Sequence, residues 1–388
     1  MSRGVAIIGV GQTNHGNRSD ISYPDMIREG VSVCFEDSGL TPKDIDGIVY
    51  GSMPSMMEGV AMNHFYFADA LGAVGKPFIR TETCGTTGIS VAMTGFYWVA
   101  SGLADLVLVV GSEKMNEGDA QAAMTTVLEP FFARPFLSGA PGYYSMLAQQ
   151  WMWRYQIPEE ICRDAAAQLS VDHHKDAMLN PHAHIRREFS LEEVKNSPVI
   201  VYPVRLLDSC PTSDGVCAMI FASEDQAKKM KNKPAWVKGV GFTGDAYFTV
   251  DSDRAKSEAA ALAAIQAYKQ AGITNPRREL DVAEVYNPFT FCELMHYETF
   301  GFCDFGEASE LALKGTFARG GELPCAPSGG VLCTNPIGAT AMIRVAEIAL
   351  QVTGRAGARQ IEGAKVGLAH GLGGTNQFNG VMILGDKL

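Results

Sequence analysis

The chain has 388 residues, of which 46% are hydrophobic and 19% charged, so it can bury a large core without disulfide bonds or structural metals. Asp and Glu outnumber Lys and Arg by 43 to 32, and the net charge of −11 argues against a nucleic acid or an anionic membrane surface as the main partner. The 41 glycines indicate an ordered α/β enzyme with many tight backbone passages.

The first predicted elements alternate between strand and helix. Val5–Val10 is a short apolar run that predicts a strand, and Pro24–Asp37 has helical periodicity. Two further strands, Asp46–Gly51 and Leu106–Gly111, flank a long apolar helix over Gly85–Leu103. This alternation predicts a parallel sheet with helices on both faces.

The second half of the chain repeats this order. A strand at Trp236–Gly241 precedes an amphipathic helix, a small-residue helix over Cys333–Gly354 and a strand at Lys365–His370. We interpret the two halves as a duplicated βαβ unit. Residues from about 115 to 196 do not fit the repeat. The predicted parts are therefore an N-terminal half (1–114 plus 197–230), an inserted loop lobe (115–196) and a C-terminal half (231–388).

The inserted lobe is rich in aromatic residues between positions 131 and 155. They form either a second small core or the wall of a pocket for a bulky acyl group. These residues are Phe131, Phe132, Phe136, Tyr143, Tyr144, Trp151, Trp153 and Tyr155.

Several common motifs are missing from the sequence. Gly9-Val10-Gly11 follows a strand, but Asn14 stands where a dinucleotide fingerprint needs its third glycine. The P-loop motif and the G-x-S-x-G motif of α/β-hydrolases do not occur.

The nine cysteines show no C-x-x-C spacing, so we expect reduced thiols and no bound metal. With no signal-peptide pattern and no apolar stretch of about 18 residues, we expect a cytoplasmic protein that does not span a membrane.

Cys84 is the strongest candidate nucleophile. It stands in Thr81–Gly88 (TETCGTTG), directly before the long apolar helix. Free backbone N–H groups and the helix dipole at such a position favour a thiolate. For the other cysteines a small buried side chain is the default interpretation.

His370 opens the glycine-rich segment His370–Gly374 (HGLGG) at the end of a strand. A lone histidine is usually a hydrogen-bonded core residue, but here the repeat places its strand and the Cys84 helix in equivalent layers. We therefore expect His370 to act as acid and base beside Cys84. The backbone N–H groups of Cys84, Leu372 and Gly373 are predicted to bind an oxyanion.

These residues carry a resemblance to the thiolase superfamily, and within it to the SCP2-type and archaeal thiolase branch. The resemblance covers the chain from end to end. The matching segments are Glu82-Thr83-Cys84, Asn180–Ala183 (NPHA), Pro203–Gly215 (PVRLLDSCPTSDG), Tyr286–Thr290 (YNPFT) with Glu293, Gly329–Ala341 (GGVLCTNPIGATA) and His370–Gly374.

The resemblance implies a five-layered α-β-α-β-α sandwich. It also implies that Cys84 attacks the 3-keto carbon of a 3-oxoacyl-CoA and that free coenzyme A, as co-substrate, then releases the acyl group. The expected substrate has a bulky acyl chain, and cleavage of benzoylsuccinyl-CoA to benzoyl-CoA and succinyl-CoA is the specific candidate.

Two departures from the family pattern affect the chemistry. Asn335 replaces the histidine of the G-H-P motif, and an amide can donate a hydrogen bond to a thioester oxygen but cannot act as a base near pH 7. Tyr286 replaces the usual His or Asn. This second change resembles the thiolase-like aldolases of steroid side-chain degradation, which lack the nucleophilic cysteine, so Cys84 favours thiolysis over retro-aldol cleavage. A non-catalytic acyl-CoA-binding subunit is the remaining alternative.

The branch commonly works with a small subunit that carries a zinc ribbon and an OB-fold. We therefore expect a homodimer of this chain with such a partner. Four arginines of the inserted lobe are the candidates for binding the CoA phosphates, although a solvated charge is their default interpretation. They are Arg134, Arg154, Arg186 and Arg187.

Overall fold

The computed structural model describes residues 3–53, 57–135, 139–247 and 253–388. Nine strands form one sheet in the order β3-β2-β4-β7-β1-β8-β11-β10-β9. They are β1 (Val5–Gln12), β2 (Gly47–Gly51), β3 (Phe78–Arg80), β4 (Leu106–Lys114), β7 (Asp214–Ser223), β8 (Ala235–Gly244), β9 (Val282–Glu284), β10 (Val366–Gly373) and β11 (Phe378–Gly385). Strands β5 (Val199–Val201) and β6 (Val204–Arg205) form a separate pair.

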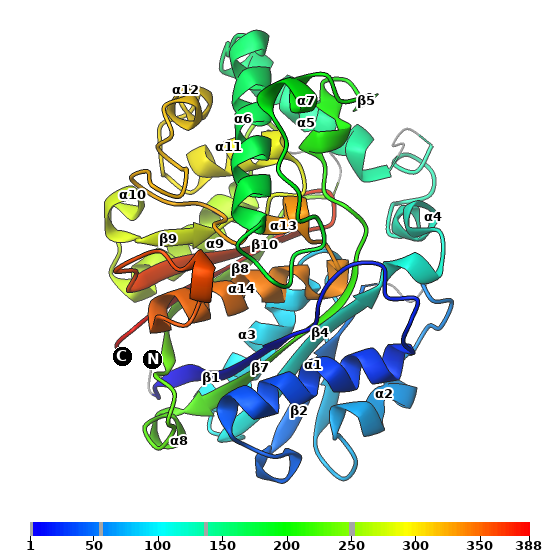
Figure 1. Cartoon of the computed structure of the whole chain (residues 1–388), viewed down its shortest axis with the longest axis vertical. Helices are drawn as coiled ribbons and strands as arrows, with labels where there is room; N and C mark the ends of the chain where they lie inside the picture. The colour runs from blue at the N-terminus through cyan, green and yellow to red at the C-terminus, as the bar shows by residue number, and fades with distance from the viewer. Residues whose placement is uncertain (1–2, 54–56, 136–138, 248–252) are drawn as a thin grey trace.

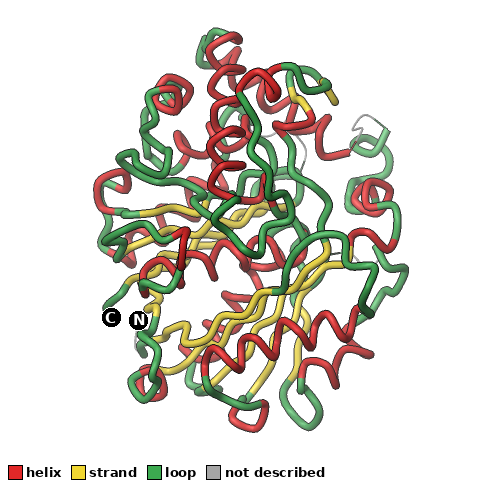
Figure 2. The backbone as a smooth tube through the Cα atoms, in the orientation of Figure 1, coloured by secondary structure: helices red, strands yellow, loops and turns green. Residues whose placement is uncertain are grey.

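The sheet folds into two halves with helices between and outside them (Figures 1 and 2). The halves meet where β1 pairs with β8, through Ala6 with Trp236 and Ile7 with Ala235. Helices α3 (Thr87–Ala100) and α14 (Ile337–Thr353) pack on each other and on both halves. Helices α1 (Tyr23–Ser38) and α2 (His64–Leu71) cover one outer side, and α9 (Glu258–Ala271) and α11 (Thr290–Thr299) cover the other. This arrangement confirms the five-layered α/β sandwich.

The two halves have the same topology. The order β2-β4-β7-β1 in one half corresponds to β9-β10-β11-β8 in the other, with α1 matching α9 and α3 matching α14. The predicted duplication is therefore confirmed. The predicted all-parallel sheet is wrong, because β7 runs antiparallel to β1 and β4, and β11 runs antiparallel to β8 and β10. Both returning strands are buried throughout or nearly so, and strands buried on both faces look alike in sequence whichever way they run.

The inserted lobe is mainly helical. It contains α4 (Ala120–Thr125), α5 (Gly139–Arg154), α6 (Glu159–Ala177) and α7 (Leu191–Lys195). Helices α5 and α6 pack on α11, and α6 also packs on α12 (Ala308–Leu313) and α13 (Gly330–Cys333). Two further short helices are α8 (Glu224–Ala227) and α10 (Pro276–Glu279). The residue boundaries of the three parts stay a prediction.

The aromatic residues of the lobe have several different environments. Trp151 is fully buried, and its Nε1 donates to Glu298 at 2.7 Å. Tyr155 stacks on Phe305, whereas Phe131, Phe132 and Trp153 are exposed. Phe136 lies outside the described residues. In the described part of the chain, no helix is long and apolar enough to cross a membrane.

Candidate active site

A pocket of about 430 Å³ lies at the N-terminal ends of the two central helices. Five of the predicted site residues line it, namely Cys84, Tyr286, Asn335, Leu372 and Gly373. Most of the remaining wall is apolar and includes Met53, Met115, Met124, Val127, Leu128, Ile200, Leu206, Phe289 and Ile337. The structure therefore brings together, around a largely apolar space, motifs that are far apart in sequence.

Cys84 lies in a tight turn just before α3. Its φ of 58° falls in the left-handed region, where a residue with a side chain is strained. The turn packs directly on the end of β10. A Cβ added to Gly85 would lie 2.6 Å from the Leu372 carbonyl oxygen, and one added to Gly373 would lie 2.6 Å from the Thr86 nitrogen. Only glycine allows this backbone approach, so the two glycine-rich motifs fix the position of Cys84.

The pKa of Cys84 differs from the sequence prediction. Burial is the largest effect and raises the pKa of the thiol, while the backbone N–H groups of Gly374 and Gly85 lower it. These amides favour the thiolate, as the sequence indicates, but the loss of water outweighs them. Gly374 was not predicted, yet its amide faces the sulfur. Oxyanion binding by the amides of Cys84, Leu372 and Gly373 stays a prediction.

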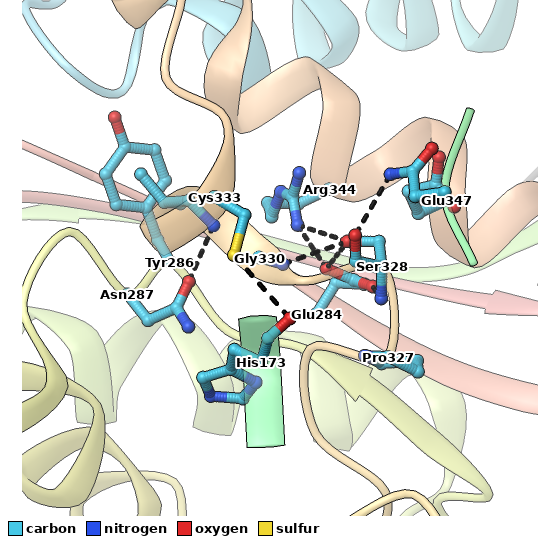
Figure 3. Close-up of polar contacts among 12 residues, drawn as sticks. His173, Glu284, Tyr286, Asn287, Pro327, Ser328, Gly330, Cys333, Arg344 and Glu347 are labelled. Carbon is cyan, nitrogen blue, oxygen red and sulfur yellow. Dashed lines mark hydrogen bonds and ion pairs between the residues drawn. The ribbon is translucent and has the colours of Figure 1, made fainter. Parts of the chain in front are cut away.

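Tyr286 is positioned by the backbone and by its neighbour Asn287. The Tyr286 N–H donates to Nδ1 of His370 at 3.3 Å. Asn287 is fully buried, and its Oδ1 accepts the Val331 N–H at 2.7 Å while its Nδ2 donates to Glu293 at 3.0 Å. Figure 3 shows the Tyr286 ring pointing away from the Asn287 side chain. The ring lines the pocket, while Asn287 ties the loop to the interior.

Two hydrogen bonds lead from Thr340 to a second thiol in the pocket. The Thr340 hydroxyl, which also faces Tyr286 and lowers the pKa of that phenol, donates to Oδ1 of Asn335 at 2.9 Å. Nδ2 of Asn335 donates to Sγ of Cys210 at 3.2 Å. Cys210 also lines the pocket, and burial raises its pKa to about 12.

The His370 side chain points to the outer helix layer. The next residue, Gly371, faces α3, where an added Cβ would lie 2.5 Å from Ile89. Because side chains alternate along a strand, His370 faces the opposite side. There its ring centroid lies 4.7 Å from that of His296 in α11 and 4.7 Å from that of Phe300, which follows the helix.

Both ring nitrogens of His370 have partners. Nδ1 accepts the Tyr286 N–H, so Nε2 carries the hydrogen and donates to Oδ1 of Asn379 at 3.0 Å. Burial and the nearby His296 hold the pKa of His370 well below its ordinary value. Among the described residues, His370 is not part of the pocket wall. The predicted juxtaposition of His370 and Cys84 is therefore not found.

Two buried ion pairs lie behind the pocket. His173 of α6 contacts Glu293 of α11 at 2.8 Å. Burial alone would lower the pKa of His173, but Glu293 outweighs this effect and raises it to about 9. Arg344 of α14 pairs with Glu284 at the end of β9, and both bind Ser328 (Figure 3). These pairs link the inserted lobe, the second half-sheet and the central helices.

Comparison with known proteins agrees with this architecture. Residues 5–139 match the model of the thiolase N-terminal domain, and residues 243–386 match the thiolase C-terminal domain-like model. An acetyl-CoA acetyltransferase of Methanothermobacter thermautotrophicus is 33% identical over 378 residues, which cover 96% of this chain and 97% of that protein. The chain belongs to the thiolase family.

Two further relatives place this thiolase in the SCP2-type branch. Sterol carrier protein 2 of Oryctolagus cuniculus is 30% identical over 95% of this chain and 70% of its own length. The benzoylsuccinyl-CoA thiolase subunit BbsB of Thauera aromatica is 28% identical over 96% of each chain. Among solved structures, the Ltp2-ChsH2(DUF35) aldolase superposes with a TM-score of 0.84 at 27% identity, over 99% of this chain and 98% of that chain. This thiolase is an acyltransferase by family.

The four predicted CoA-binding arginines of this thiolase do not converge on the pocket. Arg134 and Arg186 donate to backbone carbonyls, and Arg154 and Arg187 pair with carboxylates. None of them is among the described residues of the pocket wall. Arg134 donates to the carbonyl of Leu128, which lines the pocket. CoA binding by these arginines stays a prediction.

The sequence of this thiolase does not reveal the pocket residue Cys210. It lies within the family segment Pro203–Gly215, but nothing in the sequence distinguishes it from the structural cysteines, such as Cys333. Cys333 is instead buried behind the pocket, where its thiol donates to the His173 carbonyl at 3.5 Å. Tyr143, one of the aromatic residues of the inserted lobe, does line the pocket, as the second interpretation of those residues expects. Burial raises the pKa of its hydroxyl, and the Thr375 side chain that faces it lowers that pKa.

Among the described residues, no three His, Cys, Asp or Glu side chains are arranged to hold a metal ion. The expectation that the enzyme works without a metal stays a prediction.

Proposed function

We propose that the protein cleaves a bulky 3-oxoacyl-CoA with coenzyme A, through an acyl group carried on Cys84. The observation that supports this proposal is the placement of Cys84, which stands in a strained turn, on the wall of an apolar pocket, with two backbone N–H groups near its sulfur. The amides support the thiolate, and the apolar wall suits an acyl chain.

The reaction divides into two transfers at the same sulfur. The Cys84 thiolate attacks the 3-keto carbon, the bond between C2 and C3 breaks, and its electron pair passes to C2 of the departing acyl-CoA, which takes up a proton. The thiolate of incoming CoA then attacks the Cys84 thioester and releases the second acyl-CoA. Asn335 can give its second Nδ2 hydrogen to a thioester oxygen, while the first is bound to Cys210.

The test is the acyl-enzyme itself. After incubation with an acyl-CoA, intact-mass and peptide mass spectrometry should show one acyl group on Cys84, and Cys84→Ala should lose both the adduct and CoA-dependent cleavage. Cys303→Ser is a matched control, because Cys303 is partly buried like Cys84 but is not among the described pocket residues. Thiolysis by Cys84→Ala at the wild-type rate would refute the proposal, and so would a wild-type protein that takes up no acyl group.

For the acyl chain, we propose an aromatic one, with benzoylsuccinyl-CoA as the first candidate. Support comes from the similarity to the benzoylsuccinyl-CoA thiolase subunit and from the aromatic wall, where the Tyr144 and Phe289 rings lie 4.9 Å apart. A panel of 3-oxoacyl-CoA thioesters should show higher kcat/KM for aromatic than for short linear chains. A preference for acetoacetyl-CoA would exclude this substrate class.

Retro-aldol cleavage of a 3-hydroxyacyl-CoA is the second candidate, because the Ltp2-ChsH2(DUF35) aldolase superposes so well and Tyr286 lines the pocket. The two activities can be distinguished by whether the reaction needs free CoA as a co-substrate. Thiolysis needs free CoA, whereas a retro-aldolase cleaves a 3-hydroxyacyl-CoA without CoA and leaves Cys84 unmodified.

For the assembly, we propose a cytoplasmic homodimer with a small partner subunit of the zinc-ribbon and OB-fold type. The edge strand β3 exposes Ile79, and nearby Phe65 is 71% exposed, which favours a second copy at this edge. The aldolase above carries a ChsH2(DUF35) component, which supports a second subunit here. Light scattering should give a dimer for the chain alone, and full activity of that dimer would exclude an obligatory partner.

A further inference from the structure

The apolar wall of the pocket has two parts with different side chains. One part is the ring pair of Tyr144 and Phe289, which belongs to the main hydrophobic core. The other part contains three methionines. They are Met53, Met115 and Met124. Cys84 lies at this second part, because it packs against the small hydrophobic cluster to which the methionines belong. An acyl group bonded to Cys84 therefore begins beside the methionines.

The sheet topology brings these methionines together. Strands β2 and β4 are parallel neighbours, and Met53 and Met115 follow them at the same edge of the sheet. The carboxyl ends of parallel strands are a common place for a ligand. Met124 comes from α4, and two buried alanines of the same helix belong to the cluster.

Glu113 fixes the backbone around the two buried methionines. It is the last residue but one of β4, it is fully buried, and its Oε2 accepts the Met53 N–H at 2.7 Å. A Cβ added to Gly338 would lie 2.7 Å from the same oxygen, so the carboxyl group also packs on the first turn of α14. The backbone is thus held, while the unbranched methionine side chains can still adjust to a ligand.

The methionines lie at the deep end of the pocket. Met53 and Met115 are each 2% exposed, whereas Ile200 and Leu206 of the same wall are 43% and 53% exposed. The CoA nucleotide carries several charges and favours the exposed end, because burial of an unpaired charge is costly. The acyl end of a bound substrate is therefore directed toward the methionines.

We propose that Met53, Met115 and Met124 form the subsite for an aromatic ring of the acyl group carried on Cys84. This inference rests on the proposed acyl-enzyme. A thioether is polarisable and makes favourable contacts with an aromatic ring, often at the ring edge. A short linear acyl chain gains no such contact, so the three methionines favour an aromatic acyl group over an acetyl group.

The ε-methyl signals of ¹³C-labelled methionine report the position of the ring directly. The protein is acylated from benzoyl-CoA or from acetyl-CoA, the adduct on Cys84 is confirmed by mass spectrometry, and leucine variants of the three methionines assign their signals. In the benzoyl-enzyme the ring current should shift all three methyl signals away from their positions in the acetyl-enzyme. Met146 is the matched control, because it is 48% exposed and is not among the described pocket residues.

A kinetic comparison separates the sulfur contact from packing. Met115→Leu keeps the apolar volume but removes the sulfur, so kcat/KM for thiolysis of 3-oxo-3-phenylpropionyl-CoA should fall about two- to tenfold relative to that for acetoacetyl-CoA. Met57→Leu is the matched control and should leave this ratio unchanged. Met57 is equally buried in the same cluster but is not among the described residues of the pocket wall.

Three results overturn the assignment. The first is a benzoyl-enzyme whose three methyl signals match those of the acetyl-enzyme, which would place the ring elsewhere, for example at Tyr144 and Phe289. The second is an unchanged ratio of the two kcat/KM values in Met115→Leu. The third is a protein that takes up acetyl but not benzoyl groups on Cys84. A wild type that takes up neither group contradicts the proposed function itself, and that result is distinct from the other three.

Discussion

The buried pair of His173 and Glu293 allows a quantitative test of how the inserted lobe is attached. In His173→Gln the side chain keeps a hydrogen-bond donor but loses its charge, so Glu293 keeps neutral donors, including Tyr297 and Asn287, but has no positively charged partner. The pKa of His173 rises from 6.5 to about 9 on folding. At about 1.36 kcal/mol per pH unit this corresponds to roughly 3 kcal/mol, within the range of about 3–5 kcal/mol for breaking a buried pair.

The pH dependence has a definite sign. Because the folded pKa of His173 lies above the unfolded one, its contribution is complete below pH 6.5 and is lost as the pH rises toward about 9. Glu293 has the opposite behaviour, since its folded pKa lies below its ordinary value, and its contribution is lost only in acid. The difference in unfolding free energy between wild type and His173→Gln should therefore shrink between pH 6.5 and 9.

Urea unfolding followed by circular dichroism measures this difference. We expect a loss of about 3 kcal/mol at pH 6 for His173→Gln, partly recovered in His173→Gln/Glu293→Gln because the second change removes the unpaired charge. Lys314→Gln is the matched control, since its pair with Glu310 is exposed and should contribute less than about 0.5 kcal/mol. A loss below about 1 kcal/mol, or a loss independent of pH, would refute the assignment of a charged pair.

Three further outcomes are expected. Alkylation of Cys84 by iodoacetamide should keep accelerating past the pH at which an ordinary thiol levels off, because burial raises its pKa, and a plateau near neutral pH would contradict this. Gly330→Ala should lower the unfolding free energy by about 2 kcal/mol or more, since φ is 65° and an added Cβ would lie 2.4 Å from Asn287 Oδ1. Gly315→Ala, with φ of 76° and open space around it, should show the smaller backbone cost alone, and equal losses in thermal unfolding would exclude the clash. Tyr143→Phe should lower kcat/KM about tenfold if the hydroxyl binds substrate, while the unfolding free energy falls by no more than about 1 kcal/mol, because among the described residues the hydroxyl faces only the Thr375 side chain; an unchanged kcat/KM would exclude substrate binding by this hydroxyl.

Much of the fold could be predicted from the sequence because both halves repeat one order of elements. Predicted strands at Val5–Val10, Asp46–Gly51 and Leu106–Gly111 match β1, β2 and β4. The direction of β7 and β11 could not be predicted in the same way. Strand β7 follows the helical inserted lobe, whereas β11 follows β10 after a short turn, so their surroundings in the sequence differ although their places in the sheet correspond. Burial on both faces also removes the alternation that distinguishes antiparallel strands.

The site could be predicted in part for a related reason. Cys84, Tyr286 and Asn335 stand in motifs with unusual local sequence, and the structure brings all three to one pocket. His370 also stands in such a motif, but side-chain alternation turns it away, and only the three-dimensional position of α3 shows which face of β10 meets Cys84. Cys210 has no local signal beyond the family segment, because its importance comes from a hydrogen bond to a residue 125 positions away.

Helices α3 and α14 pair at the centre of the sandwich, and each copy of the repeat contributes a different residue to the pocket. The turn before α3 supplies Cys84, and the equivalent end of α14 supplies Asn335, so two symmetry-related positions have diverged into different chemical functions around one cavity. Neither half of the chain holds a complete site. Separately expressed halves should therefore be inert, and activity should return only when the junction between β1 and β8 re-forms and closes the cavity between them.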